Sequence, residues 1–265
     1  MVTFLHWHTL ANELALPVTK GDRPRTGSVP ANLPCILTEQ FMRFMKVSIL
    51  FFILLLLGPA YMAAFGSEAQ GAGNQGWRFA KRDSSGQAPL PAEFSDAVIQ
   101  VYAARTYSWR GHLAVHTWVS TKAVDADHYQ VHQVIGFREG NGQLVITSEN
   151  GIPDRYWYGN APELLVDIRG FQAQRLLPAV LNAVRSYAYP DTYTMWPGPN
   201  SNTFTAHIGR SVPELGLALP VTAIGKDYLP GGALIASTPS GTGYQISLLG
   251  TFGLMAAGRE GLEVN

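Results

Sequence analysis

The feature that most constrains this chain is one uninterrupted apolar run, Val47 to Phe65, which reads VSILFFILLLLGPAYMAAF. No charged residue occurs between Lys46 and Glu68. A helix of this length spans roughly 30 Å, which matches the hydrocarbon core of a bilayer. Leu, Ile and Phe cover every face, so no polar stripe marks it as a helix packed in a soluble core. The sequence therefore predicts a signal anchor at residues 42–67 that contains one transmembrane helix.

Positive charge precedes the apolar run, at Arg43 and Lys46. The positive-inside rule places this end in the cytoplasm. We therefore expect a single-pass protein of the inner (cytoplasmic) membrane, with the bulk of the chain on the periplasmic or outer side. Small residues at 63–67 leave a second interpretation open, in which a signal peptidase removes the segment.

Residues 1–41 show neither helical nor strand periodicity and contain several prolines. A signal sequence normally begins just before its basic residues, so one interpretation is that the true start is Met42 or Met45. The alternative is a disordered cytoplasmic tail. This region also holds Cys35, the only cysteine of the chain. The rest of the chain therefore has no disulfide, no thiolate metal ligand and no cysteine nucleophile.

Composition bounds the part of the chain after the anchor. Residues 68–91 are rich in Gly, Ser and Pro, which indicates a linker. Residues 92–265 are long enough for a single globular domain with its own core. The chain has 19 Lys and Arg against 19 Asp and Glu, without basic clusters, so we expect no nucleic-acid partner. Composition indicates no particular oligomeric state.

Hydrophobic periodicity predicts an α+β fold. Runs rich in β-branched and aromatic residues predict strands at 97–104, 113–121, 128–137, 144–147, 164–168, 234–237 and 244–249. Apolar residues at helical spacing predict helices at 171–187 and 203–212. Asn200 or Ser201 can cap the second helix. Strands, then helices, then strands is an order typical of an antiparallel sheet with few helices.

Four histidines occur in two pairs with a spacing of four, His112 with His116 and His128 with His132. Residues four apart on a strand share a face. A hairpin of one particular register would gather all four around a metal ion, since imidazole suits zinc. The other interpretation is separate hydrogen-bonding histidines, because the register is not evident from the sequence. We favour the second interpretation and expect no metal and no cofactor.

Four motifs carry a family resemblance. They are AVHTW at 114–118, WYGNAPELL at 157–165, WPGPNSNTF at 196–204 and TAIGKDYLP at 222–230. Together they resemble an uncharacterised bacterial membrane family known as domain of unknown function 3750. The resemblance implies a membrane-associated protein and supplies no assigned reaction.

A second resemblance concerns the order of His116 and the segment NSNTF, Asn200 to Phe204. This order is similar to that of permuted papain-like hydrolases, in which an early strand carries a histidine. Their nucleophilic cysteine follows at a helix N-terminus, often within Asn-Cys-Asn-x-Phe. The resemblance implies a permuted papain-like domain with Ser201 as nucleophile and His116 as general base. Asn200 or Asn202 would shape the oxyanion site.

The chemistry of such a site makes two demands. Free N–H groups and positive potential at a helix N-terminus can stabilise an oxyanion. A histidine can deprotonate the nucleophile when a polar neighbour sets its tautomer. On the adjoining strand, His132 or Gln133 could be that neighbour, depending on the register.

Serine in the place of cysteine leaves three interpretations of Ser201. Serine needs full general-base help, whereas a few per cent of cysteine is thiolate at neutral pH. The domain could be a serine-dependent amide or ester hydrolase of the cell envelope. It could be a catalytically inactive papain-like protein that binds a cell-envelope ligand. In the third interpretation, Asn200 and Ser201 only cap a helix.

Four further residues could support this site. Trp118 and Trp196 are expected in the core or in a groove. Lys226 and Asp227 follow Gly225, but the spacing of a phosphate-binding loop is absent. The simplest interpretation of Lys226 and Asp227 is a solvated turn with a local ion pair, and support of the Ser201 site is the alternative.

Overall fold

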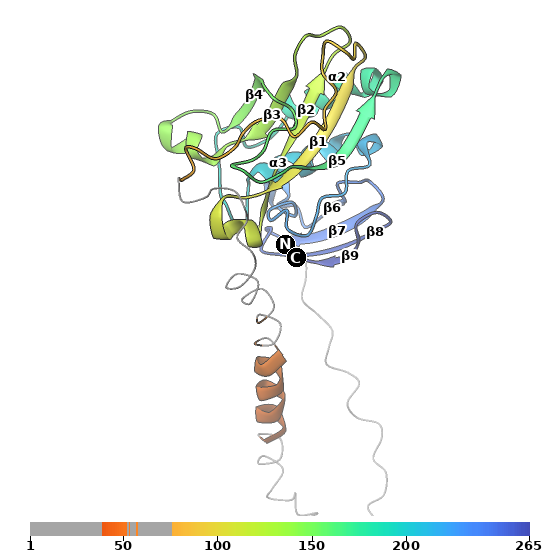
Figure 1. Ribbon diagram of the computed structural model, residues 1–265. Helices are drawn as coiled ribbons and strands as arrows, with labels where there is room; N and C mark the ends of the chain where they lie inside the picture. Colours follow the sequence, from red (N-terminus) through yellow and green to blue (C-terminus); the bar gives the residue numbers. More distant parts are fainter. Residues whose placement is uncertain (1–38, 52, 54–56, 58–75) are drawn as a thin grey trace, which may run out of the picture. The chain divides into compact units, whose positions relative to one another are not determined.

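The computed structural model of this protein describes residues 39–51, 53, 57 and 76–265 (Figure 1). The chain divides into two units, residues 1–55 and 56–265. The second unit contains every strand described below.

The first unit bears on the membrane prediction. Residues 39–51 are helical. Within the ranges that the structure describes, no helix is long and apolar enough to cross a membrane. Most of the tail 1–41 and of the apolar run 47–65 falls outside those ranges. The signal anchor at 42–67 therefore stays a prediction.

Five strands form an antiparallel sheet in the order β4-β3-β2-β1-β5. They are β1 (Val98–Arg105), β2 (Val115–Lys122), β3 (Gln130–Val134), β4 (Ile146–Asn150) and β5 (Glu163–Arg169). Each corresponds to a strand expected from the apolar runs of the sequence. Strand β1, which lies between β2 and β5, is buried along its length except for Arg105.

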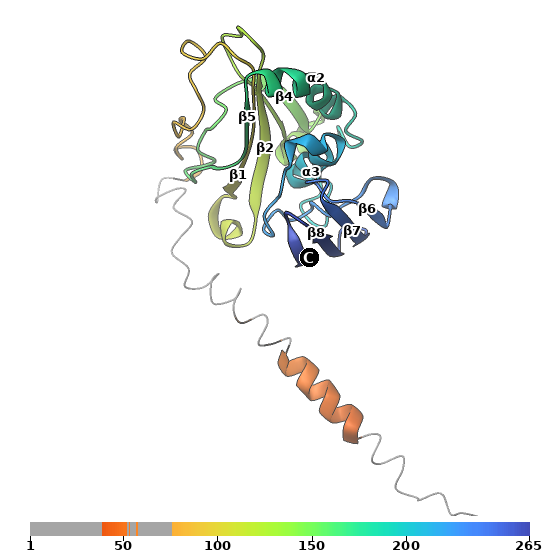
Figure 2. The same cartoon turned by 90° about the vertical axis from the view of Figure 1, so that its right-hand side faces the viewer.

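Two helices cover one face of this sheet, α2 (Phe171–Arg185) and α3 (Ser201–Ser211) (Figure 2). Both were predicted within two residues at each end. The main hydrophobic core lies between them and the sheet. Representative core residues are Ile99, Val101, Val119, Leu176, Val180, Phe204 and Ile208. The apolar stripe of α2, spaced at the helical period, therefore faces the sheet.

The start of α3 is set by Asn200. Its side-chain oxygen accepts hydrogen bonds from the backbone N–H of Asn202 at 2.9 Å and of Thr203 at 3.2 Å. The Thr203 hydroxyl oxygen accepts in return from the Asn200 N–H at 3.1 Å. This reciprocal capping box satisfies free N–H groups of the first turn. Of the two predicted caps, Asn200 is the one that forms.

The other face of the sheet lies under two loops, residues 77–91 and 151–162 (Figure 2). Buried Asp154 fastens them together. Its carboxylate accepts from the Ser84 hydroxyl at 2.8 Å and from the backbone N–H of Gln87 at 2.6 Å. The last part of the predicted linker 68–91 is therefore hydrogen bonded to the domain.

A second, four-stranded antiparallel sheet follows in the order β6-β7-β8-β9. Its strands are β6 (Ile235–Ser237), β7 (Gly243–Leu248), β8 (Phe252–Ala257) and β9 (Gly261–Val264). The first two were predicted, whereas β8 and β9 were missed. Short 3-10 helices connect the larger elements at Ser108–His112, Gly136–Asn141, Pro213–Leu215 and Pro230–Gly232. The described domain is thus a mixed α+β fold with antiparallel sheets and few helices.

Candidate functional site

Strand β2 separates the two residues of the predicted catalytic pair. Successive side chains of a strand point to opposite faces. Thr117 faces α3, where its hydroxyl lies 3.0 Å from Asn202 Oδ1 and 3.3 Å from the Ser201 carbonyl oxygen. His116 points to the loop-covered face, where its ring stacks on Trp157 with centroids 3.7 Å apart. Within the described part of the chain, no hydrogen bond joins the Ser201 hydroxyl to His116.

His116 is buried in an aromatic cluster. Its ring is nearly parallel to that of Trp157, at 12°, and stacks less closely on Trp118. Burial lowers the pKa of His116 to about 3, and the charge of Arg155 adds to this, while a hydrogen bond with Gln133 opposes it. The imidazole is therefore neutral at pH 7 and is a weak base.

Gln133 joins His116 to Arg155. Its Oε1 accepts from Arg155 Nη2 at 3.1 Å and lies 3.2 Å from His116 Nε2. Because an amide oxygen only accepts, His116 Nε2 must carry the hydrogen. Of the two residues expected to orient His116, Gln133 makes the contact. The contact directs His116 toward an arginine and away from Ser201.

His132 lies on the helix-covered face, because it is paired in register with Val119 of β2. Its Nε2 is 2.9 Å from Thr121 Oγ1 and its Nδ1 is 2.8 Å from Ser148 Oγ. Burial lowers its pKa to about 4. His116 and His132 thus occupy opposite faces. Among the residues described, no three His, Cys, Asp or Glu side chains are placed to hold a metal ion.

The amides of Asn200 and Asn202 hold the backbone together. Asn200 Nδ2 donates to the carbonyl oxygens of Met195 and Ile224, each at 3.0 Å. Asn202 Nδ2 donates to Ile224 O at 2.8 Å and to Val115 O at 3.1 Å. These bonds fasten the start of α3 to β2 and to the segment after Thr222. Both amide groups are used structurally, which leaves them poorly placed for an oxyanion.

Lys226 and Asp227 do not form the solvated turn that the sequence suggested. Lys226 is buried and forms an ion pair with Glu263 of β9, and its ammonium also donates to Pro220 O at 3.2 Å. Asp227 is buried as well, and burial raises its pKa. The solvated-turn interpretation is wrong because it lacked β9, which supplies the partner of Lys226.

The two tryptophans proposed as groove residues lie in different environments. Trp118 is fully buried, stacks on Tyr102 and donates through Nε1 to Pro153 O at 2.7 Å. Trp196 is 60% exposed. Trp118 therefore belongs to the core beneath His116, and Trp196 belongs to the surface.

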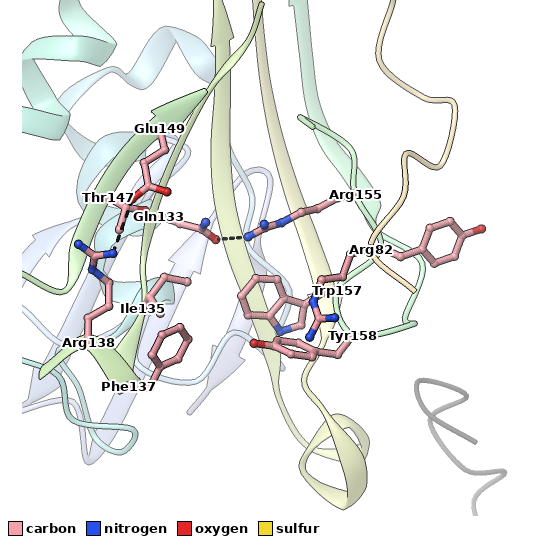
Figure 3. A pocket seen from close by; sticks show the side chains of 11 residues that line it. Arg82, Gln133, Ile135, Phe137, Arg138, Thr147, Glu149, Arg155, Trp157 and Tyr158 are labelled. Atoms are coloured by element: carbon pink, nitrogen blue, oxygen red, sulfur yellow. Dashed lines mark hydrogen bonds and ion pairs between the residues drawn. The ribbon is translucent and has the colours of Figure 1, made fainter. Parts of the chain in front are cut away.

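A pocket of about 190 Å³ opens beside the His116 cluster (Figure 3). Gln133 lies in its wall and connects it to the buried histidine. The lining also contains three arginines, Arg82, Arg138 and Arg155, and one carboxylate, Glu149. Positive charge is thus concentrated in one hollow, although the whole chain has a formal net charge of zero.

Aromatic rings support two of the arginines. The Arg82 guanidinium carbon lies 4.5 Å from the centroid of the Tyr158 ring. The Arg155 guanidinium carbon lies 5.2 Å from that of Trp157. Such contacts stabilise a cation over a π-face. Trp157 is itself held flat against His116, so the buried histidine helps to position this wall of the pocket.

Two buried polar atoms of the pocket lining, Thr147 Oγ1 and Arg155 Nε, have no hydrogen-bond partner among the described residues. On the far wall, Arg138 Nε donates to Leu144 O at 2.7 Å. Arg138 Nη1 lies 3.6 Å from Glu149 Oε1. Buried polar groups are nearly always paired, so these two buried atoms leave the pocket wall with unused hydrogen-bonding capacity.

The arginines of this pocket were missed by reasoning from the sequence. Arg82 lies in the predicted linker, Arg138 in a short 3-10 helix and Arg155 in a loop. The one local signal is the run RYWY at 155–158, which sets an arginine among aromatic residues. No periodicity connects these three segments, so only the fold brings them together.

The structure is an α+β domain with an arginine-lined pocket. A family model described as a protein of unknown function (DUF3750) matches residues 96–228, just over half of the chain. The chain belongs to this family, as its motifs predicted. No curated protein and no solved structure matches it. The resemblance to permuted papain-like hydrolases stays a prediction.

Proposed function

We propose that this protein is a membrane-anchored envelope protein whose domain binds a small anionic ligand and catalyses no reaction at Ser201. The observation that carries the proposal is the lining of the pocket. Its described residues include three guanidinium groups and one carboxylate, which leave a net charge of +2 (three positive, one negative).

The donors of the pocket suit an oxyanion. A guanidinium group presents planar pairs of N–H donors that match carboxylate and phosphate oxygens. Burial lowers the pKa of Arg155, and the nearby charge of Arg82 lowers it further. An anion bound between these two arginines would relieve that repulsion. Thr147 Oγ1 and Arg155 Nε are buried and unpaired, so a small shift of the pocket wall would add them as donors.

The size of the pocket limits the ligand. Its volume of about 190 Å³ is below the range of roughly 300–1,000 Å³ typical of sites for drug-sized molecules. The expected ligand is therefore a small phosphate or carboxylate group. That group could be a free acid or the head of a larger envelope molecule.

An inactive, permuted papain-like domain is the finer fold assignment in this proposal. Its support is the packing of the N-terminus of α3 against β2. In that packing Thr117, and not His116, faces the start of α3. A binding protein needs no general base beside Ser201, so this arrangement favours binding over hydrolysis.

The membrane anchor at 42–67 is also part of the proposal. Its support is the apolar run Val47 to Phe65 and the positive charge at Arg43 and Lys46. The anchor would hold the pocket on the periplasmic side of the inner membrane, where envelope ligands are present.

The test uses the full chain in nanodiscs of uncharged phosphatidylcholine. Inorganic phosphate replaces chloride at constant ionic strength while tryptophan fluorescence is recorded, because Trp157 lines the pocket. We expect a saturable change that Arg82→Gln weakens by about tenfold or more. Arg185→Gln is the matched control, because this exposed residue at the end of α2 removes the same charge far from the lining. Equal affinity in all three proteins would overturn the proposal.

Two further measurements separate the alternatives. Competition by phosphatidylglycerol added to the nanodisc would identify a lipid head as the source of the anion, and no competition would favour a free acid. A fluorophosphonate probe should leave Ser201 unlabelled. Labelling that disappears in Ser201→Ala would instead support the interpretation of this protein as a serine hydrolase and would contradict the inactive binding protein.

A further inference from the structure

The outward face of the second sheet is apolar and uncovered within the described domain. Every second residue of its strands points outward, Ser237 and Ala256 among them, and the eight large apolar side chains of this face are between 41% and 83% exposed. They are Ile235, Tyr244, Ile246, Leu248, Phe252, Leu254, Leu262 and Val264. We call this set the outer apolar face.

Strand register makes the outer apolar face continuous. Ile235, Ile246, Leu254 and Val264 are paired neighbours that form one row across all four strands. Leu248 pairs with Phe252 beside that row. Side chains paired across strands contact one another. The result is one contiguous apolar surface, which monomeric soluble proteins rarely expose unless it binds something.

The inward face of the same sheet has the opposite character. Gln245 and Ser247 of β7 are each 1% exposed, and Glu263 of β9 pairs with buried Lys226. A sheet that only closed a soluble domain would bury its apolar residues and expose its polar ones. In this sheet Met255 of β8 is the one large apolar side chain buried on the inward face, and the other large apolar side chains of the described strands point outward.

We propose that the outer apolar face lies on the surface of the lipid bilayer. None of its positions in the described strands carries a charge. The backbone next to Trp196 lies close to the turn between β7 and β8, because a Cβ atom at Gly250 would lie 3.1 Å from the carbonyl oxygen of Pro197. Trp196 and Tyr244 are 60% and 73% exposed. Tryptophan and tyrosine favour the boundary between hydrocarbon and water.

The length of the connecting chain supports lipid as the occupant. Residues 66–75 separate Phe65, the predicted end of the anchor, from Gly76. Ten residues span at most about 35 Å when fully extended. This inference rests on the anchor in the proposed function, which would keep the domain next to the bilayer. A second copy is a weaker occupant, because standard interfaces use roughly 20–30 residues from each partner and the outer apolar face has eight.

The test uses the full chain in vesicles of phosphatidylethanolamine and phosphatidylglycerol. In a Cys35→Ser background, Ile246→Cys carries an environment-sensitive NBD fluorophore. Phe171→Cys is the matched control, because Phe171 is 81% exposed and begins α2, outside the second sheet. We expect a blue-shifted emission at position 246 that doxyl groups on the lipid acyl chains quench. The label at position 171 should show neither effect.

Three results of the labelling experiment would overturn the lipid proposal. An unquenched label at position 246 in a vesicle-bound chain overturns the docking and leaves the anchor standing. A chain that stays out of the vesicles in flotation overturns both the anchor and the docking. A blue shift without lipid quenching, together with cross-linking between copies through position 246, identifies a second copy and also overturns the lipid proposal. The phosphate titration of the same variants reports separately on the pocket and shows that each remains folded.

Discussion

The two sheets of this protein distribute polarity in opposite ways. The five-stranded sheet has an apolar core beneath α2 and α3, and its polar pocket opens on the loop side. The four-stranded sheet packs Gln245 and the Lys226–Glu263 ion pair inward and exposes its apolar side chains. The first sheet thus buries its apolar side chains within the domain, whereas the second leaves most of its large apolar side chains exposed within the described residues. The family match ends at residue 228, so the second sheet lies beyond it.

The largest expected effect lies in the first sheet. Trp118→Ala should lower the free energy of unfolding by about 4 kcal/mol, because it leaves a cavity and removes the donor to Pro153 O. Urea denaturation of the full chain measures it. Trp109→Ala, at a side chain that is 59% exposed, is the control and should change stability by less than about 0.5 kcal/mol. Similar losses in both variants would contradict the assignment of the core.

The polar interior of the second sheet should be almost as sensitive. Glu263→Gln leaves the buried Lys226 without its ionic partner and should cost about 3 kcal/mol. The matched control Glu214→Gln changes an exposed carboxylate and should have little effect. If the two variants are equally stable, the inversion of polarity between the sheets is not supported.

The loops over the pocket should depend on Asp154. Asp154→Ala removes a buried acceptor of four donor groups in residues 84–88, and we expect a loss of about 2 kcal/mol. Hydrogen exchange of residues 84–88 should rise and phosphate affinity should fall, because Arg82 precedes this segment. Asp191→Ala, at an exposed aspartate, is the control. Unchanged exchange would show that these loops are held by other contacts.

Acid should weaken the first sheet through its two buried histidines. The folded pKa values of His116 and His132, about 3 and about 4, lie below the ordinary value of 6.5. As pH falls below 6.5, the histidines become protonated in the unfolded chain while they remain neutral in the folded chain. The stability that the two neutral histidines contribute is therefore fully present above pH 6.5 and is lost as pH falls toward 4 for His132 and 3 for His116. Each histidine should contribute a slope of up to about 1.4 kcal/mol per pH unit. Denaturation curves recorded between pH 7 and 4 measure how the free energy of unfolding depends on pH. His116→Gln should reduce the slope of that dependence by about half.

The smallest effect is expected on the outer apolar face. Leu262→Ala should change the free energy of unfolding by less than about 0.5 kcal/mol, because Leu262 is 83% exposed. The same denaturation measurement, made with the full chain in detergent, tests this. A loss above about 1.5 kcal/mol would mean that the protein itself covers this face, and the contrast between the sheets would weaken.

Most of the elements could be predicted because their signals are local. The apolar spacing of residues 171–187 predicts α2, and the β-rich runs predict the five strands of the first sheet. The strands β8 and β9 were missed: β8 contains Gly253 and two alanines, and β9 has only four residues, so neither shows a clear alternation of large apolar and polar residues. The missing β9 also led to the wrong environment for Lys226.

The sequence by itself determined the family and the strands and helices with long apolar periods, and it narrowed the cap of α3 to Asn200 or Ser201. The tertiary structure decided the site. Strand alternation places His116 on the face opposite Ser201, and no motif spacing specifies which face of β2 meets α3. The pocket gathers Arg82, Arg138 and Arg155 from segments that are joined only by long-range packing. Local patterns record the period of a strand or helix, whereas convergence of side chains depends on register and loop path, which the whole fold sets.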